Sequence, residues 1–102
     1  MYLKIHERPG QGKTTRVVAL CDKELIGKVL GKGDAMLDLN KYKNFYVGQL
    51  VDERKAVELL SGAENLNLVG ANSINAAHKA LGIDGKAAKK ISGVPHLQVY
   101  RV

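Results

Sequence analysis

The chain has 102 residues, of which 45% are hydrophobic and 25% are charged. This length and balance are typical of one folded domain, residues 1–102, with one modest core, and they exclude an intrinsically disordered chain. Sixteen Lys and Arg residues against ten Asp and Glu residues give a formal net charge of +6. An excess of this size on a small domain attracts polyanions such as RNA or DNA, and a scattered, solvated basic surface is the competing interpretation.

The cysteine content and the N-terminal segment indicate a compartment. Cys21 is the single cysteine, so one chain can form no internal disulfide and no cysteine-based zinc cluster. Residues 1–6 alternate like a strand and lack the basic flank and apolar run of a signal peptide. No apolar stretch approaches the length that crosses a bilayer. We therefore expect a cytoplasmic protein with no membrane partner.

The N-terminal segment predicts a β-hairpin. Alternation over residues 2–6 indicates a half-buried strand with Leu3 and Ile5 on one face. Residues 8–13 are rich in Gly and predict a turn, and the β-branched residues 16–21 predict a second, largely buried strand. The two strands are therefore expected to pair.

The next segment is less regular. Asp22 ends the second strand and is expected to cap a helical turn over residues 22–26. Residues 35–39 alternate and predict a further short strand. Residues 40–51 carry no clear period, so we expect a loop or an irregular strand there.

Two helices and a closing strand are predicted in the second half. Asp52 is a typical N-cap, an apolar stripe follows it, and Gly62 marks the end of the first helix. Residues 65–69 alternate briefly. The second helix ends at Gly82, after apolar or half-apolar positions at helical spacing, namely Ile74, Ala77, His78 and Leu81.

The remaining residues complete the predicted fold. Residues 86–91 are ambiguous, and residues 94–102 predict a strand whose Pro95 suits its start or an edge position. The elements together predict an α+β fold, with a small, mostly antiparallel sheet opened by the N-terminal hairpin and two main helices packed on one face.

Five short segments occur in a characteristic order: KIHERPG at 4–10, ALCD at 19–22, LVDE at 50–53, NLVG at 67–70 and GVPH at 93–96. In this order they resemble a small archaeal family of uncharacterised proteins, the domain of unknown function four-hundred-and-twenty-four. The resemblance implies an archaeal cytoplasmic protein of about this length. The family brings no established activity, cofactor or catalytic residue. Residues 11–15 and the Lys-rich segments at Lys41 and Lys86 depart from its more acidic versions.

Gly12, Lys13 and Thr14 superficially match the end of a phosphate-binding loop. The full pattern requires a glycine where this chain has Glu7, and a helix where residues 16–20 predict a strand. A basic hairpin tip is the better interpretation, and such a tip can still contact an RNA backbone.

Catalysis is an alternative that rests on three residues. His6 and His96 lie on predicted strands that are neighbours in one arrangement of the sheet, and Cys21 ends the strand paired to the first. A Cys-His pair or a two-histidine metal site is conceivable there. The competing interpretation is that Cys21 is a small buried apolar residue and that His78 is a satisfied core or boundary histidine.

The basic and aromatic residues make the more coherent case. If the first and last strands are adjacent, one sheet face carries Tyr2, Lys4, His6, His96, Gln98 and Tyr100. Rings on such a face stack on bases, and cations contact phosphates. The expected phosphate contacts are Lys4, Arg8, Lys13, Arg16, Lys41, Lys43, Lys86, Lys89 and Lys90, and the expected stacking rings are Tyr2, Tyr42, Phe45 and Tyr100.

Two competing interpretations stay open for these residues. In one, Phe45 and a tyrosine anchor the 40–51 loop in the core while the lysines are solvated. In the other, helices cover the sheet face. The function that the sequence favours is a non-catalytic RNA-binding protein in translation or RNA processing, without a cofactor or a metal. The alternatives are a small enzyme built on the His/Cys site and an interaction module for an acidic protein partner.

Overall fold

The structure is a computed structural model that describes residues 1–10, 12 and 14–100. Its main sheet has six strands in the order β5-β1-β2-β6-β8-β7. The strand bounds are β1 Tyr2–Pro9, β2 Thr14–Cys21, β5 Gln49–Leu50, β6 Asn65–Val69, β7 Lys89–Ile91 and β8 Val94–Val99. Neighbouring strands are antiparallel except β2 and β6, which are parallel. The predicted α+β fold with a mostly antiparallel sheet is confirmed.

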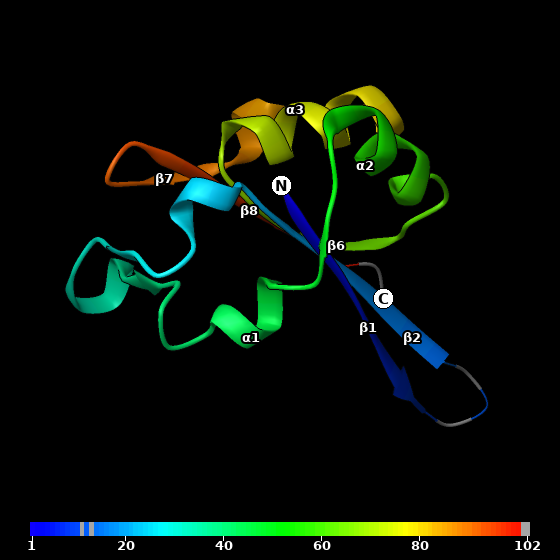
Figure 1. Ribbon diagram of the computed structural model, residues 1–102, viewed down its shortest axis with the longest axis horizontal. Coiled ribbons are helices and arrows are strands. Elements are labelled where there is room, and N and C mark those ends of the chain that lie inside the picture. The colour runs from blue at the N-terminus through cyan, green and yellow to red at the C-terminus, as the bar shows by residue number, and fades with distance from the viewer. Residues whose placement is uncertain (11, 13, 101–102) are drawn as a thin grey trace.

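Helices α2 (Glu53–Leu60) and α3 (Ala71–Leu81) pack on one face of the sheet, as predicted (Figure 1). We call this the helical face. The carboxylate of Asp52 accepts a hydrogen bond from the Lys55 amide at 2.8 Å and caps α2. Gly82 ends α3 in the left-handed conformation, and its N–H donates to the His78 carbonyl at 2.8 Å. The main core lies between these helices and the apolar side chains of β1, β2, β6 and β8.

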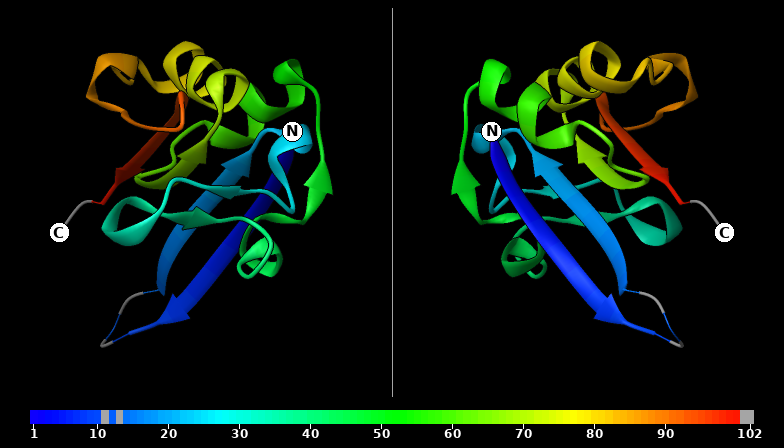
Figure 2. Two further views of the ribbon diagram at one scale, coloured as in Figure 1. Left: turned by 90° about the vertical axis from the view of Figure 1, so that its left-hand side faces the viewer. Right: turned by 90° about the vertical axis from the view of Figure 1, so that its right-hand side faces the viewer.

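A separate excursion of the chain covers the opposite face (Figure 2). It contains two 3₁₀ turns, η1 Lys23–Leu25 and η2 Gly33–Ala35, a two-stranded sheet of β3 Val29–Leu30 and β4 Leu37–Asp38, and helix α1 Lys43–Tyr46. We call this side of the main sheet the α1 face. Its second, smaller core is formed by Ala19, Cys21, Leu25, Leu39, Tyr46 and Val69. Where β2 runs beside β6 the main sheet is therefore packed on both faces, and residues 17–21 of β2 are all apolar.

Several local expectations are corrected. The strand expected over residues 35–39 is reduced to β4, and the expected loop over 40–51 contains α1 and β5. The ambiguous 86–91 stretch holds a 3₁₀ turn, η3 Gly85–Ala87, and β7. Elements as short as α1 and β7 carry no local period of their own, and their contacts with the sheet fix them instead. The last two residues of the predicted closing strand, 101–102, lie outside the described residues.

Asp22 does not cap the turn that follows it. Its buried carboxylate instead accepts hydrogen bonds from the Asn72 amide at 3.1 Å, the Ser73 amide at 2.8 Å and the Ser73 hydroxyl at 2.7 Å. The two amides belong to the first turn of α3, where they have no partner within the helix. Gly70 lies so close that an added Cβ would be 2.3 Å from the Asp22 Cγ, and its φ is +104°. Asp22 therefore joins the end of β2 to the start of α3.

The first and last strands are not neighbours, contrary to the premise of the aromatic platform. Two strands, β2 and β6, lie between β1 and β8. Three steps between adjacent strands of about 4.8 Å place β1 and β8 about 14 Å apart. The cause is the parallel pairing of β6 with β2, which brings β8 to the outer side of β6.

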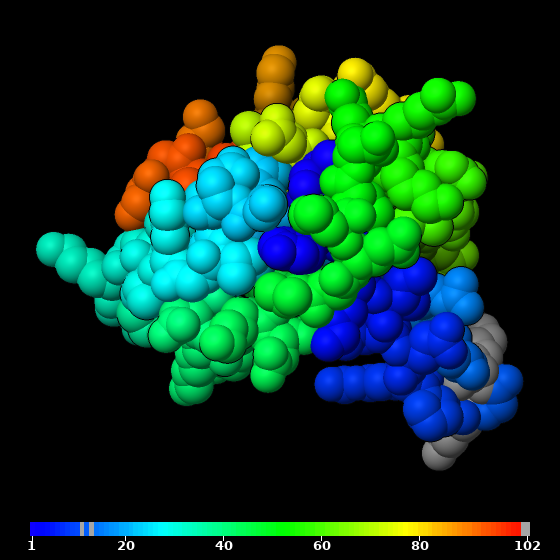
Figure 3. All heavy atoms as spheres, in the orientation of Figure 1, coloured from blue at the N-terminus to red at the C-terminus, as the bar shows by residue number. Residues whose placement is uncertain are grey.

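The β1–β2 hairpin extends beyond the two helices, and its far end projects from the body of the protein (Figures 2 and 3). Within the part of the chain that the structure describes, no helix has the length and apolar character needed to cross a membrane.

Candidate nucleic-acid interface

The α1 face carries a row of polar side chains along β1. Leu3 faces the main core, so alternation directs Tyr2, Lys4, His6 and Arg8 to the opposite side. On β8 the same rule places His96 and Gln98 on the α1 face, because Leu97 faces the main core. The expected face is therefore shared by these residues, although the two strands that carry them are not adjacent.

Helix α1 is fixed against the β1 part of this face. The rings of His6 and Phe45 stack with centroids 4.2 Å apart and planes at 10°. The His6 Nε2 donates to the Phe45 carbonyl at 2.8 Å, and the Lys4 ammonium donates to the Asn44 carbonyl at 2.6 Å. Two carbonyls at the end of this short helix thus receive donors from β1, which compensates for the missing bonds of a four-residue helix.

The same helix reaches across to β6 and β8. Phe45 meets Tyr46 edge to face at 5.0 Å, and the buried Tyr46 hydroxyl donates to the Asn67 Oδ1 at 3.0 Å. The His96 Nε2 lies 3.1 Å from the same oxygen. A continuous set of contacts therefore runs from β1 through α1 to β8, and it spans the distance that the sequence analysis had assumed to be one strand pair.

Burial controls the ionisation of the groups under α1. Burial raises the pKa of Tyr46, and the nearby Cys21 and Tyr100 raise it further. Burial also lowers the pKa of His96, and the nearby positive charge of Lys89 lowers it further. Tyr46 is therefore a neutral donor at neutral pH, and the neutral form of His96 is favoured. Alternation from the core-facing Leu97 also places Tyr100 on the α1 face, two residues after Gln98, and its side chain is 55% exposed.

The cations of the α1 face lack acidic partners. Across residues 1–10, 12 and 14–100 the ion pairs are Arg16 with Glu7, Lys55 with Glu58, and Lys79 with Glu53. None of them includes a cation of the α1 face, namely Lys4, Arg8, Lys41, Lys43 or Lys89. The Lys41 ammonium lies 5.4 Å from the centroid of the exposed Tyr42 ring, so a cation and a ring are presented together.

Not every expected contact joins this surface. Arg16 points to the helical face and pairs with Glu7 at 3.1 Å. Lys86 lies on η3, and Lys90 pairs with Pro95 on the helical side of the outer strand β7. Tyr2 lies on the α1 face but is half-buried at the start of β1, far from the hairpin tip. Lys13 lies outside the described residues.

The loop aromatics show that one competing interpretation is partly correct. Tyr46 is 3% exposed and anchors the 40–51 segment in the smaller core, while Phe45 is half-buried against His6. Tyr42 remains 54% exposed. Of the rings expected to stack, Tyr42 and Tyr100 are therefore the most accessible.

The His/Cys alternative finds little geometric support. His6 and His96 lie on strands separated by two others, about 14 Å apart by strand spacing. Cys21 is fully buried, and burial together with the charges of Asp22 and Glu24 raises its thiol pKa to about 12. A thiol with this pKa is a poor nucleophile at neutral pH. No cluster of three metal-ligating side chains occurs among the described residues. His78 is exposed rather than in the core, and its Nδ1 lies 2.9 Å from the Ile83 carbonyl.

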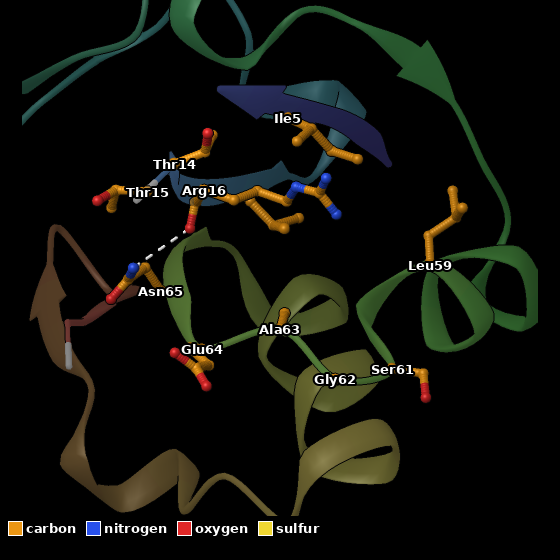
Figure 4. A pocket seen from close by; sticks show the side chains of 11 residues that line it. Ile5, Thr14, Thr15, Arg16, Leu59, Ser61, Gly62, Ala63, Glu64 and Asn65 are labelled. Carbon is orange, nitrogen blue, oxygen red and sulfur yellow. Dashed lines mark hydrogen bonds between the residues drawn. The ribbon is translucent and has the colours of Figure 1, made fainter. Parts of the chain in front are cut away.

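A groove of about 490 Å³ lies on the other side of the sheet, between the hairpin and the loop that joins α2 to β6 (Figure 4). Ile5, Arg16 and Leu59 line it together with residues 61–65. Figure 4 shows the Arg16 side chain running along the hairpin side of this groove. No sequence pattern predicts this groove, because it is formed by the hairpin and the α2–β6 loop, which lie far apart in the sequence.

Asn67 is the central residue that the sequence analysis missed. It is 5% exposed within β6, whose five residues are all buried. A buried amide requires partners, so a buried Asn between two leucines of a strand is a signal for a polar contact. The strand pattern alone did not show that the partners are Tyr46 and His96.

The comparisons with known proteins identify the family. The profile of the family described as Protein of unknown function (DUF424) matches residues 10–102, and the chain belongs to this family. Its structure is similar to one described as the crystal structure of an uncharacterized conserved protein from Methanopyrus kandleri. The TM-score is 0.67 and the identity 26%, over 99% of this chain and 93% of that one. A search of curated proteins found no match.

Proposed function

We propose that this protein is a non-catalytic RNA-binding protein that acts in translation or RNA processing in the cytoplasm. One observation carries the proposal: Arg8, Lys41 and Lys43 are exposed on the α1 face without an acidic partner among the described residues. Lys4 and Lys89 add two further cations on the same face. Cations that are not neutralised within the protein are available to phosphates, and binding to phosphates releases the counterions of the RNA.

The distribution of charge supports an RNA backbone as the ligand of this face. Arg16 pairs with Glu7 on the helical face, and Lys55 and Lys79 pair with glutamates of α2. The carboxylate of Asp38 lies near α1 and keeps its negative charge while it accepts hydrogen bonds from the amides of Asn40 and Lys41. The cations Lys4, Arg8, Lys41 and Lys43 outnumber this carboxylate, and an excess of cations raises the local concentration of a polyanion.

The test compares two triple variants of equal charge. Arg8→Gln, Lys41→Gln and Lys43→Gln together remove exposed cations from the α1 face. Arg54→Gln, Lys86→Gln and Lys90→Gln together remove the same charge elsewhere, so they control for general attraction between protein and polyanion. Lys4 is left in place because its ammonium also holds the Asn44 carbonyl. Circular dichroism and thermal unfolding verify that both variants fold.

Affinity for single-stranded RNA is measured by fluorescence anisotropy over a salt series. With about 0.7 of slope per phosphate contact, loss of three contacts lowers the slope of log Kd against log salt by about 2. This corresponds to roughly 100-fold weaker binding at about 0.1 M salt. The control triple variant should keep the slope of the original protein.

Two results count against the proposal. If the protein does not bind RNA at low salt, the proposed function is wrong. Equal losses in both triple variants, with displacement of RNA by poly-glutamate as readily as by RNA, would show that the +6 charge is a general surface property. The latter result favours the alternative of an acidic protein partner.

A further inference from the structure

We infer that the RNA bound by the α1 face is single-stranded, with bases stacked on Tyr42 and Tyr100. This inference rests on the proposed function and specifies its substrate class. The observation behind it is that accessible aromatic rings occur on the same face as cations that have no acidic partner among the described residues.

The rings occupy separate positions on the face. Tyr42 precedes α1 and is 54% exposed, and Tyr100 follows β8 and is 55% exposed. Helix α1 begins with Lys43, directly after Tyr42. An exposed tyrosine ring leaves apolar area in water, and stacking on a base removes that area from solvent.

Side-chain contacts fix α1, which follows Tyr42, on the sheet. Tyr46, Asn67 and His96 connect α1 to β6 and β8, and His6 and Phe45 connect it to β1. The exposed amide of Gln98 lies on the same face and offers a donor and an acceptor to a base edge beside Tyr100.

A duplex cannot use these features. In double-stranded RNA the base faces are stacked within the helix, and proteins contact phosphates and 2′-hydroxyls instead. The α1 face would then gain from its cations alone, and its exposed rings would contribute nothing specific. A single strand exposes base faces to both Tyr42 and Tyr100 while its phosphates contact Arg8, Lys41 and Lys43.

The experiment compares a single strand with a duplex of the same length, about 16 nucleotides, by fluorescence anisotropy at one salt concentration. Tyr42→Leu and Tyr100→Leu remove the rings and retain apolar side chains, and Tyr42→Phe and Tyr100→Phe retain the rings. Val29→Ala and Met36→Ala are matched controls, because these side chains are also more than half exposed but lie on the β3–β4 part of the excursion.

The expected result is tighter binding of the single strand, with a loss of roughly 5- to 100-fold for each Leu variant. The Phe variants should keep most of the affinity, and duplex binding should change little in any ring variant. The control variants should bind like the original protein.

Three results overturn the inference. Equal affinity for strand and duplex, with no effect of the Leu variants, would leave a phosphate-binding surface and thus the proposed function, without the stacking. If the Leu variants lose as much affinity for the duplex as for the single strand, the rings stabilise the protein structure and do not stack on bases. Binding of neither RNA removes the inference together with the proposed function.

Discussion

Replacing Asn67 by leucine removes the oxygen that Tyr46 and His96 share. The Tyr46 hydroxyl is then left buried without an acceptor, at a cost of about 1 to 3 kcal/mol. The half-buried His96 loses a weaker bond, worth about 0.5 to 1 kcal/mol. We therefore expect Asn67→Leu to lower the free energy of unfolding by about 3 kcal/mol. For a domain of this size that is a fall in Tm of about 14 °C.

Tyr46→Phe supplies the matched comparison. It removes the hydroxyl while Asn67 keeps its contact with His96, so it should cost only about 1 kcal/mol. In the double variant the Tyr46 hydroxyl and its acceptor are both replaced by apolar groups, and the penalty for a buried unpaired donor disappears. The double variant should therefore be about as stable as Asn67→Leu or more stable, rather than the sum of both losses.

Urea unfolding followed by circular dichroism measures all four proteins of this cycle. A coupling free energy of at least about 1 kcal/mol is expected between the two positions. If the two losses add within about 0.5 kcal/mol, the hydroxyl and the amide do not interact, and the account of how α1 is joined to β6 is wrong.

Two further predictions concern titratable groups. Burial and the neighbouring acids raise the pKa of Cys21 to about 12, so a disulfide reagent at neutral pH should label this thiol only at the rate of global unfolding. The labelling rate of the folded protein is compared with that of the urea-unfolded protein. Rapid labelling of the folded protein would support the His/Cys alternative. Burial lowers the pKa of His96 in the folded protein below its ordinary 6.5, so the unfolded chain binds a proton more readily than the folded protein does. The free energy of unfolding should therefore decrease as the pH falls below about 6.5 and through the folded-state pKa. The variant His96→Gln should show a smaller decrease in urea midpoint than the original protein between neutral and acidic pH, and an identical decrease would contradict the assignment.

Local signals predicted much of the fold. The Asp52 cap, the apolar stripe and the glycine after each helix located α2 and α3, because these signals lie within a few residues of the structure that they specify. Alternation also assigned the side chains of β1 and β8 to the correct faces. These features depend on neighbours in the sequence.

The strand order and the centre of the candidate interface could not be predicted in the same way. Alternation states which face a residue occupies but not which strand lies beside it, so β1 and β8 were assumed to be adjacent. Helix α1 has four residues, too few to show a period, and it forms because its ends contact β1 and β6. Asp22 finds its partners about 50 residues further along the chain, at Asn72 and Ser73, where no local pattern connects them.

The parallel pairing of β2 with β6 has a consequence for synthesis of the protein. The hairpin emerges from the ribosome first, and the edge of β2 that will pair with Asn65–Val69 stays open until that later segment is made. Side chains on both faces of this strand, Val18 and Leu20 on one and Ala19 and Cys21 on the other, are buried in the finished protein. A nascent chain that ends before β6 therefore presents a bare, apolar strand edge, the kind of surface that chaperones bind and that other nascent chains can pair with. Completion of the sheet is coupled to translation of the second half of the chain.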